Sequence, residues 1–159
     1  MPKEIERKFL VNFNEIALPE NGENIKQGYF PIADNVKTVV RIRVKASNAY
    51  LTIKGENKGA VRAEYEYAIP VNEAVEMLED MCHKPFIDKT RYEIIVDNHI
   101  WEIDIFHGEN KGLVIAEIEL SEESDKFDLP GWVGKEVTND PRYYNSNLLL
   151  NPYRKWCTT

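Results

Sequence analysis

Side chains that bind soft metals or form disulfides are scarce in this sequence of 159 residues. The two cysteines, Cys82 and Cys157, have no metal-ligand spacing and form no CxxC pair, and the three histidines are scattered. Neither set has the spacing of a zinc site or a disulfide framework. We therefore expect ordinary loop or surface histidines and a reducing, cytoplasmic location.

Long hydrophobic runs are also missing. No apolar segment approaches the ~20 residues that span a bilayer, and the first residues, MPKEIERKFLV, are typical of a strand and not of a signal peptide. The net charge of -7 argues against a non-specific nucleic-acid binder, which needs a positive surface. We expect neither membrane nor nucleic acid as a partner, and an anionic ligand would need a local basic cluster.

Linkers, repeats and low-complexity segments are absent, so residues 1–159 are expected to form one domain. A glycine-rich phosphate loop is absent as well. The nearest candidate, residues 55–59, has the wrong spacing for a P-loop. Any phosphate site must therefore be built from side chains.

Strand-like segments joined by short turns dominate the chain. We expect strands at 2–12, 25–32, 36–46, 49–55, 60–70, 86–97, 99–107 and 112–121. About eight strands with short connections predict a closed antiparallel barrel, because closure removes exposed edges.

Three segments have helix signals. Apolar residues recur at helical spacing over 72–82, with Asn72 as the expected N-cap. Ser121, followed by two glutamates, predicts a short helix. Asp140 and Pro141 predict the start of a last helix that runs to Leu150, because proline favours the first helical position.

Pairs of charged side chains two residues apart recur in six of the strand-like stretches. The sets are Glu4/Glu6/Lys8, Arg41/Arg43, Glu64/Glu66, Lys89/Arg91, Glu102/Asp104 and Glu117/Glu119. Because strand side chains alternate between two faces, each set points to one face. The intervening positions are mostly apolar, and the charges are sorted by sign. This pattern favours the inside of a barrel over a solvated sheet face.

Carboxylates and cationic groups together favour a metal–polyphosphate site. A dry interior with this many charges would be very costly, so the charged face must line a wet cavity that binds something. Carboxylate oxygens suit Mg²⁺ or Mn²⁺, and arginine and lysine suit phosphate. The alternative is a set of cross-strand salt bridges on a solvated face, with Tyr29 as a packed core residue.

Several short motifs resemble those of the CYTH, or triphosphate tunnel metalloenzyme, family. Residues 4–8 (EIERK) match its ExExK signature, which is weak alone. Further matches follow in order over nearly the whole chain: QGY at 27–29, RIR at 41–43, TIKG at 52–55, EYE at 64–66, KTRY at 89–92, EID at 102–104, EIE at 117–119 and EVTNDPRYYN at 136–145. The sequence is most similar to the short bacterial members.

The resemblance implies a mainly β (α+β) fold, an eight-stranded antiparallel β-barrel tunnel with flanking helices and a C-terminal helix near one mouth. It also implies a metal-dependent enzyme, using Mg²⁺ or Mn²⁺, that hydrolyses tripolyphosphate to diphosphate and phosphate. The alternatives are a class IV adenylate cyclase, a thiamine or nucleoside triphosphatase, and a non-enzymatic polyphosphate-binding module. No clear adenine-binding element is present, and a pure anion binder would not need the full acidic set.

Residue roles follow from the same resemblance. The metal would be ligated by Glu4, Glu6, Glu117 and Glu119, with Asp104 and then Glu64, Glu66 and Glu102 completing a second ion or holding its waters. The phosphates would be gripped by Lys8, Arg41, Arg43, Lys54, Lys89 and Arg91. Tyr29 beside Lys89 would accept the proton of the attacking water, because an ammonium stabilises phenolate, and Lys8 would act beside them.

Aromatic and aliphatic residues on the outer face leave the oligomeric state open. Tyr65, Tyr67, Trp101 and Ile103 are expected to point away from the charged face. They would either pack under helices or form the face of a homodimer.

Overall fold

A computed structural model describes residues 2–156 of the chain. The strands are β1 (Lys3–Val11), β2 (Glu23–Tyr29), β3 (Val39–Lys45), β4 (Asn48–Lys54), β5 (Val61–Ile69), β6 (Ile87–Val96), β7 (His99–Phe106), β8 (Val114–Glu119) and β9 (Val133–Glu136). The helices are α1 (Val71–Asp80) and α2 (Asn145–Leu148), with 3-10 turns η1 (Phe13–Glu15), η2 (Gly108–Asn110), η3 (Pro141–Tyr143) and η4 (Tyr153–Lys155).

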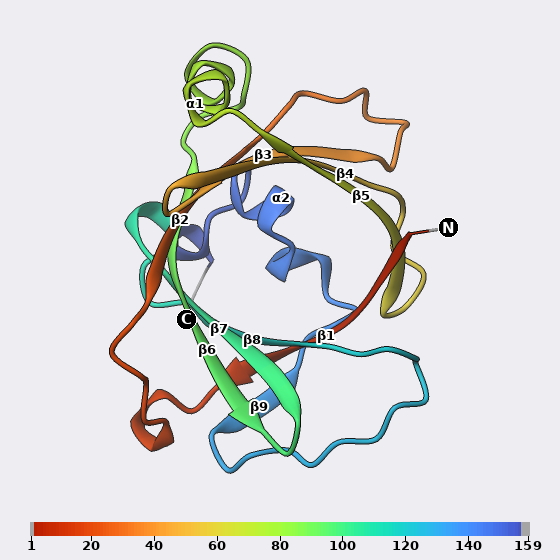
Figure 1. The fold of residues 1–159 in the computed structure, drawn as a ribbon, viewed down its shortest axis with the longest axis vertical. Helices are drawn as coiled ribbons and strands as arrows, with labels where there is room; N and C mark the ends of the chain where they lie inside the picture. The colour runs from red at the N-terminus through yellow and green to blue at the C-terminus, as the bar shows by residue number, and fades with distance from the viewer. Residues whose placement is uncertain (1, 157–159) are drawn as a thin grey trace.

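The strands form one antiparallel sheet that closes on itself. Its order is β5-β4-β3-β2-β6-β7-β8-β1-β9, and a further pairing of β1 with β5 closes the first eight strands into a ring (Figure 1). The pairing that closes the ring is short, since only Lys3, Glu4 and Ile5 of β1 pair with β5. The expected eight-stranded barrel is confirmed.

Alternation along the strands puts charge inside the ring and apolar side chains outside. On β7, Trp101 and Ile103 are buried beneath the outer layer, whereas Glu102 faces the lumen. The segment after β8 covers Trp101, whose ring lies 5.7 Å from that of Phe127 and 5.4 Å from that of Trp132. Trp101 and Ile103 are therefore core residues, while Tyr65 and Tyr67 remain exposed on β5.

Helix α1 covers the outside of the barrel over β2, β3 and β4 (Figure 1). Ala74 and Leu78 face the barrel and pack with Ile42 of β3. Gly28 of β2 allows this close approach, because a Cβ at that position would lie 2.7 Å from Leu78 Cδ2 and 2.9 Å from Cys82 Cβ.

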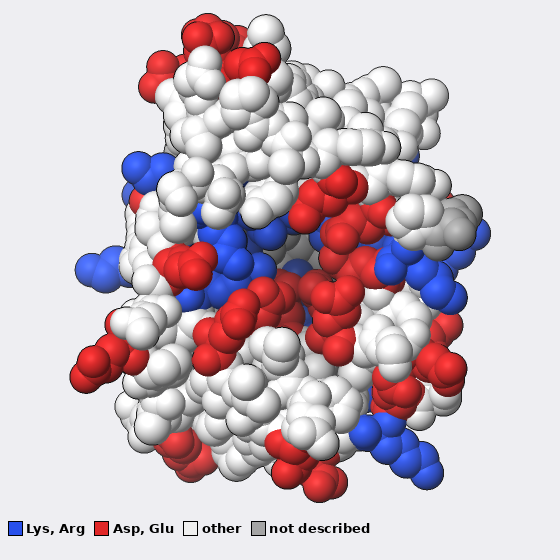
Figure 2. Space-filling model, in the orientation of Figure 1, with Lys and Arg blue, Asp and Glu red and all other residues white. Residues whose placement is uncertain are grey.

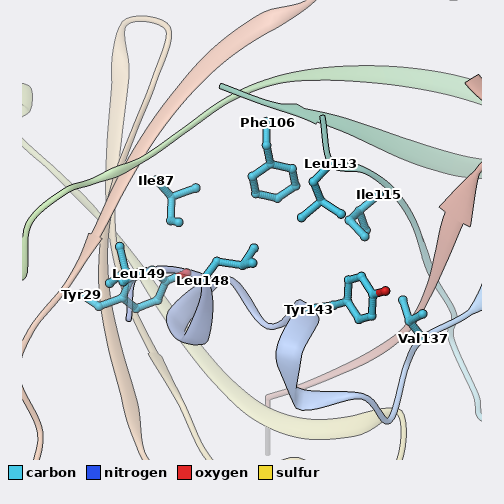
Figure 3. Packing of buried hydrophobic residues seen from close by; sticks show 9 residues of the cluster. All are labelled: Tyr29, Ile87, Phe106, Leu113, Ile115, Val137, Tyr143, Leu148 and Leu149. Atoms are coloured by element: carbon cyan, nitrogen blue, oxygen red, sulfur yellow. The ribbon is translucent and has the colours of Figure 1, made fainter. Parts of the chain in front are cut away.

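The C-terminal segment fills one end of the barrel. Tyr143 of η3 and Leu148 and Leu149 at the end of α2 pack with apolar residues from the ends of β2, β6, β7 and β8 (Figure 3). In Figure 1, α2 lies within the outline of the ring of strands. Residues that precede α2 and begin it are thereby brought into the lumen.

The expected strands and the helix over 72–82 are confirmed to within a few residues, but several local expectations were wrong. Asn72 is not the N-cap, because the chain leaves β5 through extended Pro70 and the helix begins at Val71. Ser121 starts no helix, because Asp125 Oδ2 accepts hydrogen bonds from the Ser121 backbone N–H and hydroxyl and closes a turn.

Two other elements differ from the expectation. The last helix is split into η3 and the single turn of α2; Asp140 does cap the start, accepting a hydrogen bond from the Arg142 backbone N–H. Strand β9 was missed, because its four residues are too few to show alternation. It extends the sheet along the second half of β1. Cys157 lies outside the described residues.

Gly28→Ala should destabilise the protein by about 1–3 kcal/mol, the usual cost of overpacking a tight contact. The added methyl group meets Cys82 Cβ, which cannot move without the backbone of the residues after α1. Thermal or urea unfolding measures the loss. Gly131→Ala is the control, because a Cβ there meets nothing within 4 Å; equal stability of the two variants would contradict the packing argument.

Candidate active site

A cavity of about 350 Å³ occupies the lumen of the barrel and is lined by side chains from all eight strands of the ring. Figure 2 looks onto its opening: lysines and arginines gather on the side of β2, and acidic residues on the side of β1. The structure thus brings together the charged sets of the sequence around one hollow, whose opening has a basic side and an acidic side.

Three carboxylates form the centre of the acidic side. Glu6 of β1, Glu102 of β7 and Glu117 of β8 each offer an oxygen within 4.8 Å of the others. Burial and the charges of Glu117 and Glu4 raise the pKa of Glu6 well above its usual value. Burial opposes ionisation of Glu117 as well, but the combined charges of Lys8, Arg91 and Lys89 outweigh it and lower the pKa of Glu117 to about 2.

Glu4 and Glu64 form a second acidic group around Lys54. Lys54 Nζ lies 3.1 Å from Glu4 Oε1 and 3.3 Å from Glu64 Oε2. Burial and the neighbouring Glu4 raise the pKa of Glu64 to about 7. Glu119 is exposed beside them, in register with Glu6.

Asp104 is held differently from the other acids. It is fully buried, and Arg91 binds it in a bidentate manner, with Nε–Oδ1 at 2.7 Å and Nη2–Oδ2 at 2.8 Å. Lys89 Nζ adds a contact of 2.8 Å. Burial opposes its ionisation, but the two cations keep the pKa of Asp104 far below its usual value. Both of its oxygens are therefore engaged by cations, unlike those of Glu6.

The arginines of β3 differ in how they are paired. Arg41 Nη2 lies 3.4 Å from Glu66 Oε2 and 3.1 Å from Thr52 Oγ1, and its buried Nε has no hydrogen-bond partner among the described residues. Arg43 donates to Gln27 Oε1 at 3.0 Å. Burial and the charges of Arg41 and Arg91 lower the pKa of Arg43 to about 10. Arg41 and Arg43 form the basic wall of the cavity, and both have hydrogen-bond donors or charge available for an anion.

Tyr29 and Lys89 lie at the closed end of the cavity and are connected through two amides. Gln27 Nε2 donates to the Tyr29 hydroxyl at 2.8 Å and to Asn145 Oδ1 at 3.1 Å. Asn145 Oδ1 also accepts from Lys89 Nζ at 2.9 Å. Burial and the nearby Arg91 and Arg43 lower the pKa of Lys89 to about 7, although Asp104 opposes this.

Sequence reasoning missed several lining residues. Gln27 and Asn145 lie within the QGY and EVTNDPRYYN motifs. They were missed because an uncharged amide does not stand out in a search for charged residues. Arg62 lines the cavity from β5, two positions before Glu64, and donates to the Gly55 carbonyl. Its spacing from Glu64 was the signal that could have found it.

The acidic side fits a hard divalent cation. Among residues 2–156 no lysine or arginine forms an ion pair with Glu6, so three converging carboxylates are only partly neutralised, by Lys8 on Glu117 and Arg91 on Glu102. Burial likewise raises the pKa of Glu102. An oxygen-only donor set of this kind is what Mg²⁺ or Mn²⁺ prefers.

A closed antiparallel barrel with acidic and basic walls facing each other across its lumen defines a class of β-tunnel that can hold a cation and an anion together. Residues 2–147 match the CYTH domain, and the chain belongs to the CYTH family.

Two relatives support this assignment, and a further solved structure shares the fold. The chain is 51% identical over 156 residues to an inorganic triphosphatase of Acetivibrio thermocellus, a match covering 98% of this chain and 99% of the relative. The solved structure of an inorganic triphosphatase superposes with a TM-score of 0.66 at 33% identity, covering 94% and 96% of the two chains. A putative adenylate cyclase from Bacillus halodurans shares the fold, with a TM-score of 0.63 at 21% identity, covering 77% and 84%.

Glu6→Gln should abolish stabilisation by a divalent metal. A ligand at 100 times its Kd stabilises a protein by about 2.7 kcal/mol, so Mg²⁺ or Mn²⁺ should raise the melting temperature of the natural protein and not that of the variant. Without metal, Glu6→Gln should melt at the same temperature or higher, because a like charge is removed.

Glu79→Gln is the control for this measurement, since Glu79 is exposed on α1, outside the lumen. Equal stabilisation of Glu6→Gln and Glu79→Gln by metal would place the cation elsewhere.

Proposed function

We propose that this protein is an inorganic triphosphatase that hydrolyses tripolyphosphate to diphosphate and phosphate. The observation that carries the proposal is a lumen with a basic wall facing three converging carboxylates. The relatives support it, because two proteins named inorganic triphosphatase match this chain over nearly its whole length.

The basic residues would hold the phosphates. Arg43 has no carboxylate partner among residues 2–156, and Arg41 has an unpartnered buried Nε, so both have hydrogen-bonding capacity to spare. Lys8, Lys54, Lys89 and Arg91 surround the same cavity. Phosphoryl transfer depends mainly on positioning and charge neutralisation, and a ring of cations supplies both.

The metal would be held by Glu6, Glu102 and Glu117, with Glu4, Glu64 and Glu119 close by. A bound Mg²⁺ or Mn²⁺ would neutralise phosphate charge and polarise the bond to be broken. Glu66 and Asp104 also belong to the acidic set, but Glu66 is engaged by Arg41 and Thr52 and Asp104 by Arg91 and Lys89. Their place in the proposal is to hold these cations.

The proton of the attacking water would pass to Tyr29. Its hydroxyl oxygen accepts a hydrogen bond from Gln27, an interaction that stabilises a phenolate as well. Lys89 is close through Asn145 and carries a cationic group into the same end of the cavity. Tyr29, Lys89 and Lys8 therefore remain our candidates for the catalytic group.

We further propose that residues 1–159 act as one domain in the cytoplasm, with a small triphosphate as substrate. The single sheet supports the first point. In the described part of the chain, no helix has the length and apolar character needed to cross a membrane. Tyr65 and Tyr67 are exposed on the outside of the barrel, and we propose that they form the face of a homodimer.

Phosphate release from tripolyphosphate, diphosphate, ATP and thiamine triphosphate, with and without Mg²⁺ or Mn²⁺, tests the function. Tripolyphosphate should be the best substrate and turnover should require metal, because cationic groups line the lumen opposite the carboxylates and the described lining residues form no apolar pocket for a base. Faster production of cyclic AMP from ATP would favour a cyclase, and tight binding without turnover would favour a polyphosphate-binding module.

Tyr29→Phe should lower kcat about 10²- to 10⁴-fold, the usual contribution of a general base, with KM little changed. The ring and its packing remain, and only the hydroxyl is lost. Tyr67→Phe is the matched control, since Tyr67 is exposed on the outer face of β5. Near-full kcat in Tyr29→Phe would make Tyr29 a packing residue.

A further inference from the structure

Gln27 is a buried amide whose hydrogen-bonding groups are all in use. It is fully buried within β2. Its Oε1 accepts from Arg43 Nε at 3.0 Å, and its Nε2 donates to the Tyr29 hydroxyl and to Asn145 Oδ1. Arginine can only donate, so the amide can take just one orientation. Gln27 thus links an arginine of the basic wall to the tyrosine and the asparagine at the closed end.

Asn145 continues this network to Lys89. Its Oδ1 accepts from both Gln27 Nε2 at 3.1 Å and Lys89 Nζ at 2.9 Å. An ammonium group has three hydrogens; Lys89 also contacts Asp104 Oδ2 at 2.8 Å and is one of the residues that line the lumen. Without Asn145, Asp104 would be the one polar partner left to position the ammonium group of Lys89 among residues 2–156.

The packing of the C-terminal segment fixes the position of Asn145. Asp140 caps the start of η3, and Tyr143, Leu148 and Leu149 are buried on both sides of Asn145 in the end of the barrel. The side chain of Asn145 faces the cavity, whereas that of Asn147 donates to the Pro141 carbonyl on the exposed side. The segment therefore delivers the Asn145 amide to the lumen at a defined place.

We infer that Asn145 and Gln27 are positioning residues for the reaction, and that the C-terminal segment acts through them to orient Lys89, Tyr29 and Arg43. This inference rests on the proposed triphosphatase function. Neither amide needs to touch the substrate for this role. The phosphates would still be bound by Arg41, Lys54 and Arg91 when the network is broken, so turnover should suffer more than affinity.

Asn145→Ala tests the inference through kinetics on tripolyphosphate at a temperature well below unfolding. We expect kcat to fall about 10- to 100-fold with KM changed less than about threefold. Asn147→Ala is the matched control: it is the same residue type on the same helical turn, and it should lower the melting temperature while keeping kcat. If both variants lose kcat equally, or Asn145→Ala keeps it, the inference is wrong.

Asn145→Asp supplies the conservative variant. A carboxylate still accepts from Lys89 and Gln27, so kcat should recover most of the loss seen in Asn145→Ala. KM should rise, because a negative charge then faces the phosphates. A kcat as low as that of Asn145→Ala would overturn the role assigned to the shared oxygen.

A measurement that does not depend on catalysis distinguishes this inference from the proposed function. In an NMR spectrum, the side-chain amide protons of Gln27 should exchange slowly in the natural protein and in Asn147→Ala. In Asn145→Ala one of them loses its acceptor, so its signal should shift and exchange faster; unchanged signals would overturn the network. If the natural protein shows this pattern but does not hydrolyse tripolyphosphate, only the proposed function fails.

Discussion

An ionised side chain inside a barrel is tolerated only where an opposite charge or a suitable hydrogen-bond partner lies next to it, and this constraint orders the lumen. Asp104 shows it most clearly. It is completely buried, and its cost of desolvation is offset by Arg91 and Lys89 at hydrogen-bond distance on the neighbouring strand. Because β6 and β7 pair in register, with Arg91 opposite Asp104, the sheet itself creates the ion pair. The register of β4 and β5 likewise places Lys54 opposite Glu64.

Compensation is incomplete at Glu6 and at Arg43, where the proposed function places its ligands. Glu6 lies among carboxylates on the acidic side, and Arg43 is held by a neutral amide on the basic side. A charge left without its counterpart in a protected site is costly, so both positions gain from an external ligand of opposite sign. A cation and a polyanion bound together would satisfy the two at once.

The sequence was sufficient for the barrel because period-two alternation is visible in most strands of the ring. It also placed the six charged sets on one face, since a side chain's face follows from its position in the strand. It was insufficient for β9, which is too short to show alternation. It was also insufficient after Ser121, where the Asp125 carboxylate accepts hydrogen bonds from the backbone N–H groups that would begin a helix. Nor could spacing reveal that Gln27 and Asn145 meet, because they come from opposite ends of the chain and neither is charged.

The way β1 is embedded has a consequence for how the protein acquires its structure. β1 is the first strand in the chain, yet it pairs with β5, β8 and β9, and Glu6 has Glu119 as its partner. Pairing strands that are far apart in the sequence requires closing long loops, and the entropy of closure is lost before the contacts form. Such topologies therefore fold slowly. During synthesis, β1 can pair with β5 once that strand has emerged, but its pairing with β8 and β9 must wait until nearly all the chain has emerged, so part of its edge is exposed to other chains meanwhile. Alternating charge on β1 therefore also protects the nascent chain from pairing with the wrong edge.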